Sequence, residues 1–395
     1  MKPIISPLPE SSGRVFQLEV CRGLAAMVVF FNHFLAAFFP HGADSLRGNP
    51  LFVLINGHAA VMFFFVLSGY VLTHRFYVTN DPKILVLGAA KRLPRLAGST
   101  TLITIISCLL FITGAYHFRE AFTVTGSTWL QTAGGGFPAD FHPSIMDAFW
   151  QGSVKTFFRG DDSYNTNLWT MNIEFMGSLL VFALALPLRN GFGARRLLLG
   201  AAIATMPFLF TQPYYVAFVF GTGLAFLHTF RKSSYARLTT ITVVILSLFF
   251  LSFETTVGYE NTGSNKLFGF FRPQDPVQRT LFDALVPICG ASMLIQLVAC
   301  GACNQILDGF GMFGRFLGRA SFSLYLCHPL VIWSFSSWMF LQFRPSHGLA
   351  LTLALTFPTT ILVVLALAWP LTVFDEWWTR MINRKIGLVF DKSQI

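Results

Sequence analysis

The sequence predicts an all-α, polytopic integral membrane protein with about ten transmembrane helices and both termini in the cytosol. Its composition is 54% hydrophobic, 16% aromatic and only 12% charged, with 45 phenylalanines. So few charged residues could not cover the surface of a water-soluble fold of 395 residues. Apolar runs long enough to cross a bilayer recur along the chain, and basic residues gather between them. These three observations place the chain in a lipid bilayer.

Each predicted span is an apolar run of about 20 residues. The first begins near residue 20 and has no small-residue cleavage site behind it, so we expect a retained helix and not a signal peptide. The fifth and sixth are short and meet at Thr211-Gln212-Pro213, where we expect a tight turn. The predicted spans are residues 20–39, 51–73, 98–116, 168–188, 197–212, 213–230, 239–257, 281–302, 319–342 and 348–370.

The distribution of Lys and Arg predicts the orientation of these spans. With a cytosolic N-terminus, 20 of the 28 basic residues lie in inner connections and eight in outer ones. The net charge of +10 therefore reflects topology, and no nucleic-acid partner is expected. The six cysteines lie within or beside apolar runs, and the Cys300-x-x-Cys303 pair has no second pair, so we expect reduced packing residues and no metal site.

We expect residues 1–370 to form a single transmembrane domain, followed by a cytosolic basic tail at 371–395. The longest connection, residues 117–167, is predicted to face outside. It holds a helical pattern whose apolar residues recur every three or four positions, which indicates a helix lying at the outer membrane interface. That apolar face consists of Ile145, Met146, Phe149, Trp150, Val154, Phe157 and Phe158.

Two ionisable residues, Arg22 and His33, lie in the first span. Eleven residues make about three helical turns, so both side chains project from one face, about 16 Å apart along the axis. An Arg at a helix end is often a topology anchor, and a membrane-embedded His can be a neutral imidazole bonded to a neighbouring helix. However, an ionisable group at that depth is costly and indicates a functional site.

Counting from the span ends places His33 and Glu174 near the midplane or just outside it, and His328 just inside. Ionisable side chains at matching depth are expected to face one another or a wet cavity. Four basic residues lie together at the inner edge: Arg22, His74, Arg92 and Arg95.

Five segments in order along residues 22–329 resemble the acyltransferase-3 family of membrane O-acyltransferases. The chain departs from the family pattern in two places: Phe175 follows Glu174 where a second acidic residue is common, and Pro94 lies between two arginines. The segments are Arg22 with His33, residues 64–70 (FFVLSGY), residues 91–95 (KRLPR), residues 168–175 (LWTMNIEF) and residues 321–329 (SFSLYLCHP).

The resemblance implies a multi-pass enzyme of the bacterial inner membrane that transfers an acyl group, acetyl by resemblance, from cytosolic acyl-CoA to a hydroxyl of a polysaccharide, lipid-linked glycan or similar acceptor. Guanidinium groups bind phosphates in bidentate fashion, so Arg22, Arg92 and Arg95 are candidates for holding acetyl-CoA. Ser68 precedes Gly69 in the second segment, and this pair could either allow close helix packing or line the acyl channel.

A neutral imidazole suits the removal of a hydroxyl proton near pH 7, and His33 is our candidate for this base. Glu174 could orient it as a carboxylate does in hydrolase triads, although His328 or Tyr325 could equally be the partner. Tyr325 and His328 share a helix face, which fits catalysis, site architecture or ordinary packing. Pro329 is expected to free a carbonyl in that helix.

Other interpretations remain open. The polar run at residues 160–167 could bind an acceptor sugar or be a solvated loop. A secondary transporter could use His33 and Glu174 as a proton relay, but it should show inverted repeats, and the sequence has none. A purely structural protein would not require the five segments. Transfer could be direct or through a covalent acyl-enzyme.

Overall fold

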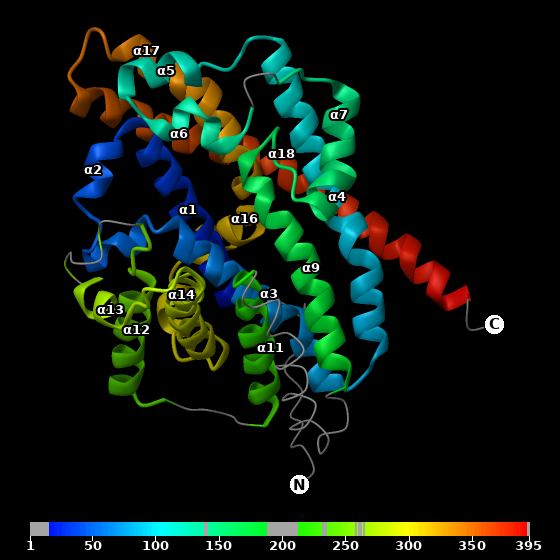
Figure 1. Ribbon diagram of the computed structural model, residues 1–395. Helices are drawn as coiled ribbons and strands as arrows, with labels where there is room; N and C mark the ends of the chain where they lie inside the picture. The colour runs from blue at the N-terminus through cyan, green and yellow to red at the C-terminus, as the bar shows by residue number, and fades with distance from the viewer. Residues whose placement is uncertain are drawn as a thin grey trace. The chain divides into compact units, whose positions relative to one another are not determined.

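The computed structural model describes residues 16–137, 141–187, 212–230, 235–256, 259, 263 and 265–392. Throughout these ranges the regular elements are helices and no strand occurs, which confirms the all-α prediction. Seven helices of the described chain are long and apolar enough to cross a membrane. They involve α1 (Phe16–Phe38), α3 (Gly57–Thr79), α4 (Lys83–Ile112), α9 (Trp169–Ala185), α14 (Pro276–Ala299), α16 (Gly311–Val331) and α18 (Leu349–Lys392) (Figure 1).

Two shorter apolar helices, α11 (Tyr214–Phe230) and α12 (Arg237–Leu251), correspond to the sixth and seventh predicted spans. The fifth, residues 197–212, lies outside the described residues but for its last position. The total of ten spans therefore stays a prediction. The remaining short helices are α2 (Pro40–Asp44), η1 (Pro50–Leu54), α5 (Phe118–Thr125), α6 (Thr128–Gln131), η2 (Ala133–Gly135), α7 (Ile145–Trp150), η3 (Gln151–Lys155), α8 (Thr156–Arg159), η4 (Thr166–Leu168), α13 (Asn265–Phe271), α15 (Asn304–Asp308), η6 (Ile332–Ser336) and α17 (Ser337–Phe343).

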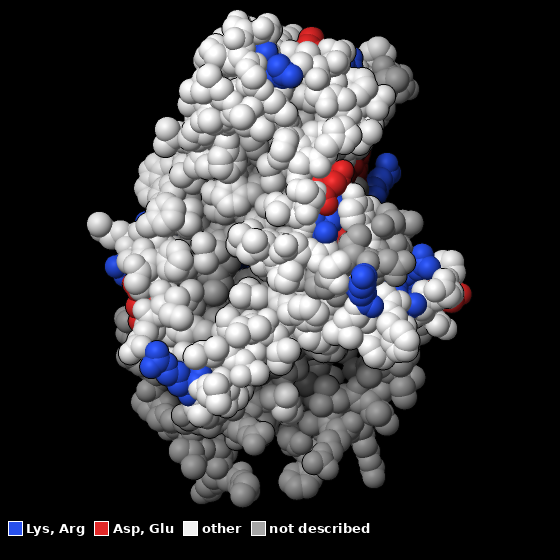
Figure 2. Space-filling model, turned by 90° about the vertical axis from the view of Figure 1, so that its left-hand side faces the viewer, with Lys and Arg blue, Asp and Glu red and all other residues white. Residues whose placement is uncertain are grey.

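The described surface is that of a membrane protein. Large apolar side chains such as Leu238, Ile245 and Leu362 are more than half exposed on the helices. Figure 2 shows one face of the molecule, on which Lys, Arg, Asp and Glu are few and scattered. Exposed apolar side chains of this density are stable only against lipid, so the surface agrees with the composition.

The chain divides into two compact units, and the single transmembrane domain stays a prediction. Unit 1 comprises Met1–Ala25, Arg47–Ala89 and Gly177–Arg319, and unit 2 comprises Ala26–Leu46, Ala90–Met176 and Ala320–Ile395. Within unit 1, α3 and α11 pack with their backbones in close contact. A Cβ added to Gly69 would lie 2.2 Å from the Phe218 carbonyl oxygen, and one added to Gly221 would lie 2.0 Å from that of Val66. Gly69 therefore serves helix packing.

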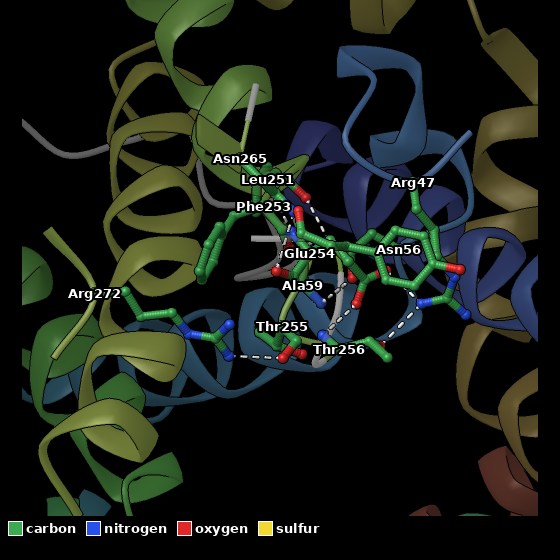
Figure 3. Close-up of polar contacts among 11 residues, drawn as sticks. Arg47, Asn56, Ala59, Leu251, Phe253, Glu254, Thr255, Thr256, Asn265 and Arg272 are labelled. Carbon is green, nitrogen blue, oxygen red and sulfur yellow. Dashed lines mark hydrogen bonds and ion pairs between the residues drawn. The ribbon is translucent and has the colours of Figure 1, made fainter. Parts of the chain in front are cut away.

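Asn56 joins the start of α3 to the end of α12 in unit 1 (Figure 3). Its side-chain oxygen caps α3 by accepting a hydrogen bond from Ala59 N at 3.1 Å. Its Nδ2 donates to the carbonyl oxygens of Leu251 and Phe253, each at 2.9 Å. One amide thus satisfies groups that two helix ends leave unpaired.

Glu254 anchors the neighbouring loop of unit 1 (Figure 3). Its buried carboxylate accepts from Arg47 Nη1 at 2.6 Å and from Thr256 N at 2.7 Å. The Arg47 guanidinium also lies over the Tyr259 ring, 5.1 Å from its centroid. The carboxylate of Glu254 is paired with a cation and also accepts a hydrogen bond from a backbone N–H. This network therefore has a structural role, in which it stabilises the loop.

Helix α18 of unit 2 continues through residues 371–392, which the sequence analysis assigned to a tail. This extension packs against α4. Trp378 Nε1 donates to the Pro94 carbonyl at 2.7 Å, and Ser99 Oγ donates to Asp375 Oδ1 at 2.6 Å. Gly98 gives the indole its space, because a Cβ there would lie 2.3 Å from Trp378 Nε1.

The helix predicted around residues 145–158 exists as α7, η3 and α8. Its small and polar face packs on α4, where Thr100 Oγ1 donates to Gly152 O at 2.6 Å and Thr104 Oγ1 to Ala148 O at 2.8 Å. Of the predicted apolar face, Phe157 is buried, and its interfacial position in the membrane stays a prediction. The exposed apolar side chains are Ile145, Met146, Phe149, Trp150 and Phe158.

Candidate active site

Pro329 interrupts the hydrogen bonding of α16 in unit 2. Proline has no N–H, so the Tyr325 carbonyl four residues earlier lacks its helical donor. Asn167 Nδ2 donates to that carbonyl at 2.7 Å, and Asn165 Nδ2 donates to the Leu326 carbonyl at the same distance. Both asparagines are buried just before α9, where Asn165 caps η4 and Asn167 lies within it. The carbonyl that the sequence analysis expected to be free is therefore bonded by side chains from another helix.

His328 has a defined tautomer. Its Nδ1 lies 2.9 Å from the Leu324 carbonyl oxygen, which can only accept, so Nδ1 carries the hydrogen. In a neutral ring, Nε2 is then an acceptor. His33 Nδ1 lies 2.9 Å from this Nε2, so His33 donates to it. The hydrogen of a neutral His33 is thereby on Nδ1, and its lone pair is on Nε2.

His33 Nε2 has no hydrogen-bond partner among the residues that the structure describes. His33 is half-buried, whereas His328 is fully buried. The chain of contacts from Leu324 O through His328 to His33 therefore leaves one imidazole nitrogen, on a partly accessible ring, able to accept a proton.

Glu174 forms an ion pair with Arg92, and both side chains are largely buried. Of the partners left open for His33, the structure provides His328 and not Glu174. The Tyr325 hydroxyl lies 3.0 Å from Thr170 Oγ1, and the Tyr325 ring centroid lies 6.1 Å from that of His328. Tyr325 and Thr170 thus join His328 to α9, the helix that carries Glu174.

Comparison with known families confirms the resemblance that the sequence predicted. A model of the acyltransferase-3 family, described as an acyltransferase domain, matches residues 15–373. The chain belongs to the acyltransferase-3 family. Neither a curated protein nor a solved structure matches it.

The residues that this acyltransferase-3 protein was expected to use for the acyl donor occur in both units. Arg22, whose Nη2 donates to the Gly318 carbonyl at 2.9 Å, and Ser68 belong to unit 1. Arg92 and Arg95 belong to unit 2. Arg92 is neutralised by Glu174. Their contact with CoA stays a prediction.

A second group of rings occurs in unit 1 of this family member. The Tyr70 hydroxyl lies 2.6 Å from His228 Nδ1. His74 stacks on both rings, with centroids 5.1 Å from Tyr70 and 5.6 Å from His228. Tyr70 is the last residue of the FFVLSGY segment, so this motif is joined directly to α11.

The polar run at residues 160–167 has two parts. Its second half is structural, because Asn165 and Asn167 bond to α16. Its first half is half-buried, with Asp161 Oδ1 accepting from Ser163 Oγ at 2.8 Å. Burial and the neighbouring Asp161 raise the pKa of Asp162 to about 6. Acceptor binding by this half stays a prediction.

Two residues near the histidine pair were not predicted from the sequence. They are Trp129, whose ring lies 5.0 Å from that of His33, and Thr170, which contacts the Tyr325 hydroxyl. The role of the two asparagines was not predicted either. Pro329 was a usable signal for Asn167, because a carbonyl without a donor in a buried helix requires one from elsewhere. Trp129 gave no such signal, since the segment around α6 has no periodic pattern that would place it over α1.

Proposed function

We propose that this protein is a membrane O-acyltransferase of the bacterial inner membrane that transfers an acetyl group from cytosolic acetyl-CoA to a hydroxyl of a polysaccharide, lipid-linked glycan or similar acceptor. Membership of the acyltransferase-3 family supports the reaction class. The observation that carries the proposal is the histidine pair, because it leaves Nε2 of His33 as a base inside a membrane bundle.

The reaction begins when His33 Nε2 removes the proton from the acceptor hydroxyl as its oxygen attacks the thioester carbonyl carbon. The tetrahedral intermediate then collapses, the C–S bond breaks, and the departing CoA thiolate takes the proton from Nε2. His328 accepts the Nδ1 hydrogen of His33 throughout and keeps the ring oriented. In hydrolase triads a carboxylate accepts the hydrogen bond from the catalytic histidine. Here the acceptor is the neutral imidazole of His328, which donates its own Nδ1 hydrogen to the Leu324 carbonyl.

We favour direct transfer over a covalent acyl-enzyme. A covalent route needs a nucleophile activated by the base, and no Ser, Thr or Cys of the described chain bonds to His33. In the same proposal Arg22, Arg92 and Arg95 bind the phosphates of CoA, and Ser68 lines the acyl path. A proton-coupled transporter is less well supported, since its relay would join His33 to Glu174, whereas Glu174 is paired with Arg92.

The test compares ester groups on surface glycans of cells that carry the gene, lack it, or lack it and express His33→Ala. We expect ester content to fall in the deletion strain, to return with the wild-type gene, and to stay low with His33→Ala. His347→Ala is the matched control, because the His347 imidazole lies in the turn after α17 and, in the described chain, hydrogen-bonds only to the Phe343 backbone carbonyl. Equal ester content in all strains would contradict the proposal that the acceptor is a surface glycan.

A further inference from the structure

The connection that follows α4 reaches back over the first helix. Ser127 Oγ donates to the Ala36 carbonyl at 2.6 Å, one turn beyond His33, and accepts from Leu130 N at 3.1 Å to cap α6. Leu130 is fully buried. The beginning of the connection is fixed by a second hydrogen bond. His117 N donates to the Trp333 carbonyl in the π-helical turn η6 at 2.9 Å. Helix α6 therefore has a fixed position near the base.

Trp129 of α6 stacks on the ring of the proposed base. Its ring centroid is 5.0 Å from that of His33, and the two planes are inclined by 28°. Gly134, with φ of 69°, leaves space for the indole edge, since a Cβ there would lie 2.9 Å from Trp129 Nε1. The side chain is half-buried, unlike Trp333, which lies 6.0 Å away and is fully buried.

The proposed reaction assigns no role to Trp129. A residue that served packing alone would be expected to be fully buried like Trp333, but Trp129 is half-buried and stacks on the half-buried ring of His33. A polar ligand with an apolar ring face fits such a site, because its carbon face packs on the aromatic ring while its hydroxyls point to the rim. The buried Nε1 of the neighbouring Trp333 has no acceptor among the described residues.

We propose that Trp129 is the platform on which a sugar ring of the acceptor packs, with the hydroxyl to be acylated at His33 Nε2. This rests on the proposed acyltransferase function, and it assigns the acceptor side of the site to carbohydrate. Trp129 thereby selects an acceptor with a ring over a simple alcohol, and it holds the reacting hydroxyl within reach of the base.

The test uses purified full-length protein in nanodiscs and, as probe, surface polysaccharide from the producing cells freed of esters by mild alkali. Binding is measured by microscale thermophoresis without acyl donor, and transfer is measured separately with labelled acetyl-CoA. We expect Trp129→Leu to weaken glycan binding and raise the glycan KM about tenfold or more, with Trp129→Phe between Leu and wild type. The KM for acetyl-CoA should stay within about twofold. Trp338→Leu, an exposed tryptophan of the same unit, is the matched control.

The outcomes separate the two proposals. Wild-type binding that Trp129→Leu leaves unchanged, or no wild-type binding, overturns the platform. Binding that depends on Trp129 without any acetyl transfer keeps the platform and removes the proposed reaction. If Trp129→Leu instead shifts the pH profile of kcat at constant glycan KM, the indole acts on the charge of His33 and the platform is wrong.

Discussion

Which nitrogen of His33 can act as a base is decided by the Leu324 backbone carbonyl, two hydrogen bonds away. That carbonyl fixes the hydrogen of His328 on Nδ1, and His328 fixes the hydrogen of His33 on Nδ1. A neutral imidazole has one donor and one acceptor, so each contact leaves no choice for the next. The two histidines therefore act as a unit, and a substitution of His328 should alter the orientation of His33.

We predict that His328→Leu lowers kcat about 100-fold or more, because His33 Nδ1 then loses its acceptor and the ring its orientation. His328→Gln should keep at least about tenfold more activity than His328→Leu, since a glutamine oxygen can accept from His33 Nδ1. The measurement is acetyl transfer by protein in nanodiscs, with folding checked by size-exclusion chromatography. Equal activity of folded Gln and Leu variants would show that His328 does not orient His33.

At this scale the sequence predicted the depth of the ionisable residues in their helices better than their contacts. Depth along the helices pointed to His33 and His328, because it follows from the rise per residue. The pairing of Glu174 with Arg92 depends on the rotation of α9 against α4, which the chain's periodicity does not determine. Glu174 was therefore one of three equal partners for His33 until the structure separated them.

At the scale of elements, the contact between α16 and the start of α9 depends on a hydrogen-bond donor that α16 lacks and the neighbouring segment supplies. Pro329 removes one hydrogen bond from α16, and Asn167 supplies another from outside. A side chain that repairs a break in a second helix fixes the separation of the two helices. The position of His328, one residue before Pro329, is set by the same exchange.

We predict that Asn167→Ala lowers the free energy of unfolding by about 1–3 kcal/mol, because the Tyr325 carbonyl is left buried without a donor. Pro329→Ala restores an N–H that can bond to this carbonyl within α16. The double variant should therefore lose less than the sum of the single variants, as measured by thermal unfolding in detergent. Additive losses would mean that Asn167 stabilises through something other than the freed carbonyl.

Spans were easier to predict from the sequence than the segments between them. Nine predicted spans match described helices because long apolar runs have few alternatives in lipid. The helix at α7 to α8 was also predicted, but the pattern gave no reason to expect that Gly152 would pack on Thr100. The order of short helices that places Trp129 over His33 is a product of tertiary contacts alone.

At the scale of the whole molecule, α18 bears on the orientation of the chain. Its 44 residues are about 66 Å long at about 1.5 Å per residue, more than twice the roughly 30 Å of bilayer hydrocarbon. One end must therefore leave the membrane core. The end beyond residue 370 carries the exposed Arg380, Arg384 and Lys385, and basic residues favour the cytosolic side.

We predict that Arg384 faces the cytosol and His142 the outside, since an even number of spans puts both termini inside. Both residues are exposed, so Arg384→Cys and His142→Cys should present reactive thiols. In intact spheroplasts a membrane-impermeant maleimide should label the cysteine at 142 at once and the cysteine at 384 only after permeabilisation. Wild type gives the background, because its six thiols are buried or half-buried. Labelling of both positions before permeabilisation would put them on the same side of the membrane. That result would mean an even number of spans between them and would contradict the seven that the sequence predicts.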